Sequence, residues 1–158
     1  MKFTPAVITL YCGIALFAAC KKTDDTDNKN NNTSAARQAL EAGKWQMIAG
    51  TATINYMGKD TSIDIYSQMD QCDKDDFMQF AADGKATMDE NTNKCPDDAQ
   101  VETATYALLN NDTKLAIVDS NPDTFDLEIS TTQMKLKITK PNTSGTPVTT
   151  IQTYKNIK

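Results

Sequence analysis

The chain contains no histidine among its 158 residues. This absence excludes Ser-His-Asp and Cys-His catalysis, and it removes the commonest zinc ligand. Aspartate and glutamate are plentiful, but no pair has a spacing that indicates general acid–base catalysis. We therefore expect no catalytic residues and no cofactor. The protein is predicted not to be an enzyme, and a hydrolase is the weaker alternative.

Positive charge is also scarce, because 16 Lys and Arg side chains stand against 21 Asp and Glu, which gives a net charge of −5. Binding of nucleic acid requires clustered basic residues, and attachment to anionic lipid by charge requires them too. The composition therefore predicts no nucleic-acid partner and no electrostatic binding to a membrane.

The apolar run of residues 6–17 is shorter than the roughly 20 residues that a membrane-spanning helix needs. It follows Lys2 and precedes Ala18, Ala19 and Cys20, an arrangement typical of a secretory signal. Its end resembles the lipobox of bacterial lipoproteins, in which an apolar residue and two small residues precede the cysteine. The resemblance implies that a lipid is attached to Cys20 and that the chain is cut before it. An ordinary signal peptide followed by a chance cysteine is the alternative.

The segment that follows Cys20 is charged and polar, so it cannot bury apolar surface. We expect a signal peptide over residues 1–19, a disordered tether over 20–33 and one folded domain over 34–158. Residues 21–25 loosely resemble the signals that send some lipoproteins of Bacteroidetes-type bacteria to the outer face of the outer membrane, and a solvated linker is the alternative. The prediction is an outer-membrane lipoprotein, held by its N-terminal lipid and facing the periplasm or the cell surface.

Cysteine is rare in the rest of the chain, where only Cys72 and Cys95 occur. An exported protein meets an oxidising environment, so we predict a disulfide between them. The lack of a CxxC spacing disfavours a redox or metal-binding pair. Acidic side chains crowd both cysteines, but they lack the spacing of an EF-hand, and we predict no metal site. These residues are Asp70, Asp73, Asp75, Asp76, Asp97 and Asp98.

Residues 34–42 predict a short helix, because Thr33 or Ser34 can cap its start and Gly43 can end it. After Gly43, apolar and polar residues alternate with period two, and turn signals recur every 8–12 residues or so. The second strand is predicted to include residues 63–66, and no helix is expected after Gly43. The pattern predicts an all-β fold, a small antiparallel up-and-down β-barrel of about eight strands with a short N-terminal helix.

Several features also occur in an order that resembles one family. Gly43-Lys44-Trp45 opens the first strand, where lipocalins carry Gly-x-Trp. Cys72 precedes a Phe-x-x-Phe hairpin at residues 77–84, and Cys95 follows its return strand. The set is similar to the lipocalin-like domains of Bacteroidetes outer-membrane lipoproteins over about residues 40–158. The resemblance implies an eight-stranded calycin-type barrel that allows an internal cavity, although the chain lacks the C-terminal helix of true lipocalins, which argues against a roomy one.

The inward-facing side chains of such a barrel either fill its interior or line a cavity for one small ligand, and both alternatives stay open here. Trp45, the only tryptophan, is expected to plug the closed end beneath the helix, and a pocket-lining role is the alternative. We predict binding of a small apolar or amphipathic molecule. The alternative is a packed barrel that acts as an interaction module for another envelope protein. The candidate cavity residues are Met47, Tyr56, Phe80, Tyr106, Leu108, Leu127, Met134, Leu136 and Ile138.

Overall fold

The computed structural model describes residues 33–96 and 98–158. The predicted signal peptide, Cys20 and nearly all of the predicted tether lie outside these residues, as does Asp97. Within the described ranges, no helix is both long and apolar enough to cross a membrane.

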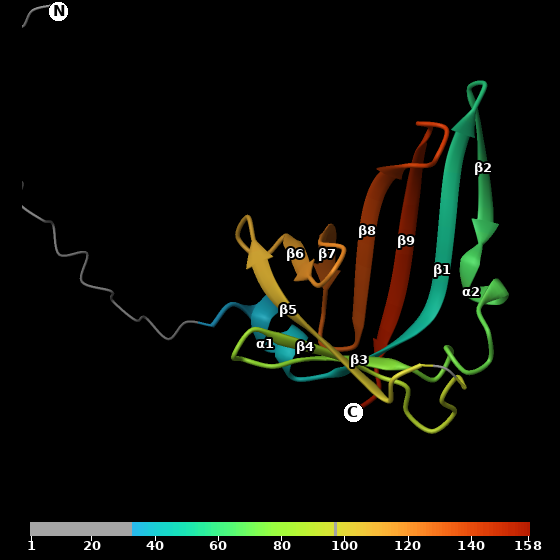
Figure 1. Cartoon of the computed structure of the whole chain (residues 1–158). Coiled ribbons are helices and arrows are strands. Elements are labelled where there is room, and N and C mark those ends of the chain that lie inside the picture. The colour runs from blue at the N-terminus through green and yellow to red at the C-terminus, as the bar shows by residue number, and fades with distance from the viewer. Residues whose placement is uncertain (1–32, 97) are drawn as a thin grey trace, which may run out of the picture. The chain divides into compact units, whose positions relative to one another are not determined.

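Two short helices and nine strands make up the described part of the chain (Figure 1). In chain order they are α1 (Ala35–Glu41), β1 (Lys44–Tyr56), β2 (Lys59–Asp64), α2 (Ile65–Gln68), β3 (Phe77–Phe80), β4 (Lys85–Asp89), β5 (Val101–Leu109), β6 (Lys114–Val118), β7 (Asp123–Ile129), β8 (Gln133–Pro141) and β9 (Pro147–Asn156).

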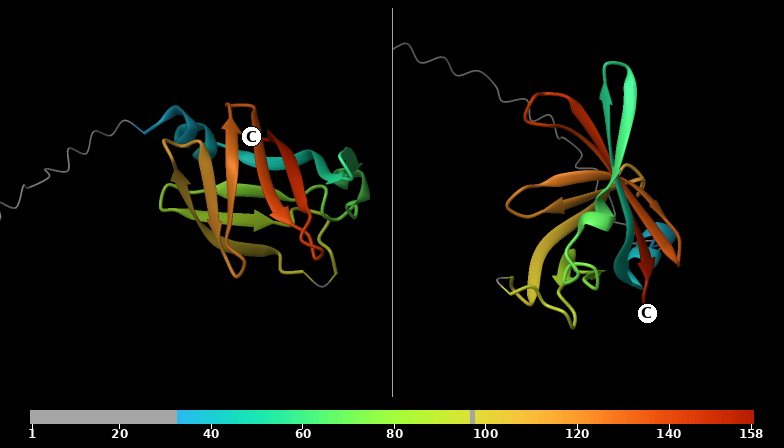
Figure 2. Two further views of the ribbon diagram at one scale, coloured as in Figure 1. Left: turned by 90° about the horizontal axis from the view of Figure 1, so that it is seen from above. Right: turned by 90° about the vertical axis from the view of Figure 1, so that its right-hand side faces the viewer.

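The strands form a closed antiparallel barrel, which confirms the predicted fold class. From β3 to β9 each strand pairs with the next, β1 pairs with β3, and β1 also pairs with β9, which closes a ring of eight strands. The remaining strand, β2, lies outside this ring. It pairs with the second half of β1, from Thr51 to Tyr56, whereas β3 pairs only with residues 44–46 of β1. The β1–β2 hairpin therefore extends beyond the short strands β3 and β4 (Figures 1 and 2).

One end of the barrel is closed by α1. Of the two predicted caps, Thr33 and Ser34, it is Ser34 that caps this helix, by accepting a hydrogen bond from the Arg37 backbone amide. Leu40 on α1 and Trp45 on β1 are both fully buried, and Trp45 Nε1 donates a hydrogen bond to the Leu40 carbonyl at 2.9 Å. The lone tryptophan thus fills the space beneath the helix.

The prediction of a strand through residues 63–66 is wrong beyond Asp64, and a second helix does follow Gly43. Ile65–Gln68 forms a single helical turn, α2. Asp64 caps it, because its carboxylate accepts a hydrogen bond from the Ser67 amide at 3.0 Å and its carbonyl accepts one from Ser67 Oγ. This local capping ends β2 where period-two alternation alone would have continued it.

Candidate functional site

A cavity of about 260 Å³ lies inside the barrel at the end opposite α1. Because the strands alternate in direction, this open end carries the β4–β5, β6–β7 and β8–β9 connections. Its walls are mostly apolar, with polar side chains toward the opening. The main apolar lining residues are Met78, Ala86, Ala104, Ile117, Phe125 and Leu136.

Small side chains on neighbouring strands create this space. Ala86 on β4 lies directly opposite Ala104 on β5 in the sheet register, and both line the cavity. Opposite residues of an antiparallel pair lie on the same face of the sheet. The two alanine methyl groups therefore occupy positions where larger side chains would contact each other. The interior is therefore left partly unfilled at this end.

Polar groups gather around the opening and belong to several elements. Glu102 lies on β5, Asp119 and Asn121 on the β6–β7 connection, and Asp123 at the start of β7. Asp123 forms an ion pair with Lys140 of β8. The Asp119 carboxylate accepts a hydrogen bond from the Asn121 amide at 2.6 Å.

A buried tyrosine lies beside the cavity. Tyr154 is 8% exposed, and its hydroxyl donates a hydrogen bond to Gln152 Oε1 at 3.3 Å. Burial raises the pKa of Tyr154 well above its ordinary value. Its phenol therefore stays neutral and adds an uncharged aromatic side chain to the cavity lining.

A lipocalin-like domain family matches residues 42–136, which are 95 of the 158 residues. The chain belongs to this lipocalin-like family. A search of curated proteins finds no match. The matched range runs from the end of α1 into β8 and contains most of the cavity wall of this lipocalin-like barrel.

The structure brings most of the predicted cavity residues into one core but places only one of them at the cavity of the lipocalin-like domain. Leu136 lines it, whereas Met47, Phe80 and Leu127 are buried elsewhere in the core, as is Met134. The half-buried members of the predicted set are Leu108 and Ile138.

Tyr56 does not belong to the interior of the lipocalin-like barrel, contrary to the prediction. It is 63% exposed and lies at the end of β1, opposite Lys59 in the β1–β2 hairpin. This part of the hairpin extends beyond the ring of eight strands, so an inward-facing side chain here has no opposite wall to contact.

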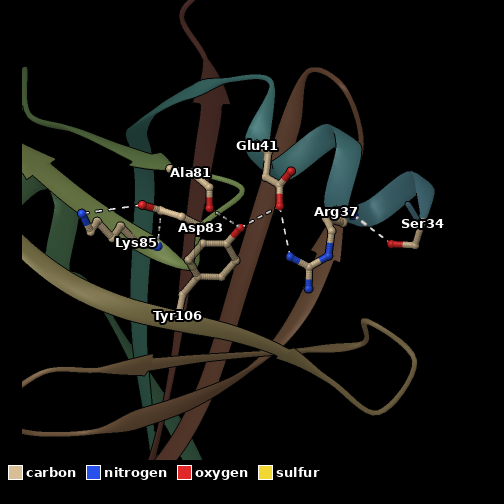
Figure 3. A network of polar contacts seen from close by, with 7 residues as sticks. All are labelled: Ser34, Arg37, Glu41, Ala81, Asp83, Lys85 and Tyr106. Carbon is tan, nitrogen blue, oxygen red and sulfur yellow. Dashed lines mark hydrogen bonds and ion pairs between the residues drawn. The ribbon is translucent and has the colours of Figure 1, made fainter. Parts of the chain in front are cut away.

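Tyr106 faces the closed end instead of the cavity (Figure 3). Its hydroxyl lies within hydrogen-bond distance of Glu41 Oε1 on α1, at 2.9 Å, and of the Ala81 carbonyl after β3, at 3.0 Å. Glu41 also forms an ion pair with Arg37. Burial, together with the hydrogen bond to Glu41, raises the pKa of Tyr106 to about 12. Tyr106 therefore holds α1 to the barrel.

The predicted disulfide between Cys72 and Cys95 is confirmed, with 5.2 Å between the two Cα atoms. It joins the segment before β3 to the segment after β4, at the open end of the lipocalin-like barrel. Asp75 Oδ2 accepts hydrogen bonds from the backbone amides of Thr92 and Asn93, which holds the same two segments together.

The acidic residues near the disulfide interact with one another. Burial raises the pKa of Asp76 to about 7, and nearby carboxylates contribute, of which Glu90 has the largest effect. The other contributing carboxylates are Asp73, Asp75 and Asp98. Glu90 is itself 8% exposed and accepts a hydrogen bond from the Cys95 amide.

These carboxylates do not form a metal centre of a recognised kind. In the described part of the chain, two groups bring three potential ligand atoms close together, namely Cys72 with Asp73 and Cys95, and Glu90 with Cys95 and Asp98. Each group includes Cys95, whose sulfur is in the disulfide and cannot act as a thiolate ligand. Asp75 and Glu90 instead accept hydrogen bonds from backbone amides of these loops.

Asp76 is expected to make stability depend on pH. Its folded-state pKa of about 7 lies above its ordinary value of 3.8, so the folded state binds its proton more tightly and stability falls as the pH rises from about 4 to 7. We expect Asp76→Asn to remove this fall and to exceed the wild type by about 1–2 kcal/mol at pH 8 but not at pH 4, allowing for solvent screening. Urea unfolding at the two pH values measures the difference.

Asp70→Asn is the matched control, because Asp70 is an exposed carboxylate of the same segment. It should leave the pH dependence of the wild type unchanged. Equal slopes of stability against pH for the wild type and Asp76→Asn would show that Asp76 titrates normally in the folded protein.

Proposed function

We propose that this lipocalin-like domain binds a small apolar or amphipathic molecule in the cavity at its open end, and that it is a binding protein and not an enzyme. The cavity is the observation that carries the proposal, because about 260 Å³ of space with apolar walls and a polar opening is what a small ligand requires. Eight-stranded barrels of this kind hold one small ligand when side chains do not fill them.

Filling the cavity should weaken binding. Ala104→Phe places a phenyl ring in the cavity beside β4. We expect the affinity for 2-phenylethanol to fall by about tenfold or more, because the ring displaces apolar contacts of the ligand that are together worth over about 1.4 kcal/mol. Ligand-observed NMR measures the affinity. Ala107→Phe is the control, because Ala107 is exposed on the other face of the same strand.

We also propose that the protein is an outer-membrane lipoprotein held by a lipid on Cys20, facing the periplasm or the cell surface. Support comes from the N-terminal sequence and from the disulfide, which is typical of exported proteins.

Cys20→Ser should move the protein from the membrane fraction to the soluble fraction, as judged by immunoblotting. Cys12→Ser, inside the predicted signal, should leave it in the membrane, and retention of Cys20→Ser there would contradict the lipid anchor.

A second candidate function is that of an interaction module for another envelope protein. Exposed apolar side chains on the β1–β2 hairpin favour it: Tyr56 is 63% exposed, Met57 88% and Ile63 50%. Native mass spectrometry of protein purified from its own host separates the two functions. A co-purifying small molecule supports ligand binding, whereas a stoichiometric protein partner supports the interaction module.

A further inference from the structure

We propose that the cavity selects small molecules that carry a cationic head group on an apolar body. This inference rests on the proposed function and adds to it the chemical class of the ligand. It follows from the charges at the opening, from the elements that hold them and from the size of the apolar space.

The carboxylates are part of the cavity lining itself. Glu102 lies two residues before Ala104 on β5, so both side chains are on the inward face of the strand. Asp119 and Asp123 reach the opening from the β6–β7 connection and from β7. A ligand whose apolar body enters the cavity therefore leaves its head group among carboxylates that come from β5, from the β6–β7 connection and from β7.

The opening carries negative charge that its own surroundings do not neutralise. The cavity lining contains three carboxylates and no Lys or Arg side chain. Asp123 is paired with Lys140, but among the described residues neither Glu102 nor Asp119 forms an ion pair. An ammonium group would gain two acceptors here, whereas a carboxylate such as that of a fatty acid would be repelled.

The acidic loops strengthen this preference. The β4–β5 connection, with Glu90 and Asp98, lies at the same end of the barrel as the opening, and the disulfide holds it to the segment that contains Asp73, Asp75 and Asp76. These segments carry more acidic than basic side chains, with Lys74 and Lys94 as their cations. An excess of charge of one sign beside a cleft raises the local concentration of oppositely charged ligands. This field acts on a cation before it reaches Glu102 or Asp119.

The volume limits the apolar body. About 260 Å³ lies just below the lower end of the range for drug-sized ligand pockets, about 300–1,000 Å³. A single ring with a short side chain fits this space, whereas a long acyl chain does not. The inferred ligand class is thus a small aromatic or short-chain aliphatic amine.

Three probes of similar shape test the inference with the purified full-length protein: 2-phenylethylamine, 2-phenylethanol and 3-phenylpropionate. Ligand-observed NMR at low salt should show the amine binding about fivefold or more tightly than the propionate, with the alcohol between them, because each exposed charge contact is worth up to about 1 kcal/mol. Raising the salt concentration should reduce the differences in affinity among the three probes, since exposed charges are screened.

The double variant Glu102→Gln, Asp119→Asn should bring the affinities of the amine and the propionate within about twofold of each other, and the affinity of the uncharged alcohol should change least of the three. Glu128→Gln is the control, because Glu128 is an exposed residue of β7 outside the cavity lining. Equal binding of all three probes by the wild type, lost in Ala104→Phe, would overturn the charge selection alone. Binding of none of them, or binding that Ala104→Phe leaves intact, would overturn the proposed function as well.

Discussion

Replacing Trp45 with alanine is expected to lower the free energy of unfolding by about 3–5 kcal/mol, the range for removal of a large buried aromatic side chain. Trp45 is fully buried between α1 and the barrel, and its indole nitrogen donates a hydrogen bond to the Leu40 carbonyl. The substitution leaves a cavity at the closed end and a buried carbonyl at the end of α1 without its donor. The lost apolar volume and the lost hydrogen bond both belong to the contact between α1 and β1, so α1 should also pack less tightly against the barrel.

Urea unfolding followed by far-UV circular dichroism measures this loss, because the variant has no tryptophan fluorescence. Trp45→Phe helps to separate the two contributions, since it keeps most of the apolar volume but cannot donate the hydrogen bond. Trp45→Phe should lower the free energy of unfolding by less than Trp45→Ala does. A loss below about 1 kcal/mol for Trp45→Ala, typical of a surface substitution, would mean that α1 does not depend on this contact.

The strands of the barrel could be predicted because their signals are local. In β7 and β8, Leu127 and Leu136 occur at alternating positions and are paired across the two strands in the structure. The helix cap at Ser34 and the alternation of apolar and polar residues along each strand are likewise recognised from short stretches of sequence. The disulfide followed from the small number of cysteines and the expected exported location.

Irregular points of the backbone were not predictable from alternation. The pattern places Trp45, Met47 and Ala49 on one face, but the register shifts between Met47 and Ala49, and Gly50 is buried while Ala49 is exposed. A β-bulge of this kind inserts one residue and reverses the faces that follow. A Cβ at Gly50 would lie 2.7 Å from Met47 Cε and 2.8 Å from Ile65 Cγ1, so a larger residue at this bend would have to displace these side chains.

The cavity residues were mostly missed for a different reason. The prediction selected large apolar residues at inward positions, and such residues fill a core: Met47, Phe80 and Met134 pack together away from the cavity. The space exists where Ala86 meets Ala104. Two alanines at inward positions of consecutive strands are a usable signal for unfilled space, but it depends on the register between strands, which alternation within one strand does not give.

Removing the disulfide is the second large effect that we expect. The double variant Cys72→Ser, Cys95→Ser should be less stable than the wild type by about 3 kcal/mol on the chain-entropy account, because the bridge closes a loop with a sequence separation of 23. The bridge joins segments that are otherwise held by polar contacts, such as those from Asp75 to Thr92 and Asn93. Its loss should therefore loosen these loops beside the cavity.

Urea unfolding with and without dithiothreitol tests this expectation. The reductant should lower the stability of the wild type to that of the double variant and should leave the double variant unchanged. Because the bridge also holds the acidic loops at the cavity opening, its reduction should weaken the preference for 2-phenylethylamine over 3-phenylpropionate while binding of 2-phenylethanol persists. A wild type whose stability does not respond to complete reduction, verified by thiol titration, would show that the polar contacts alone hold the loops.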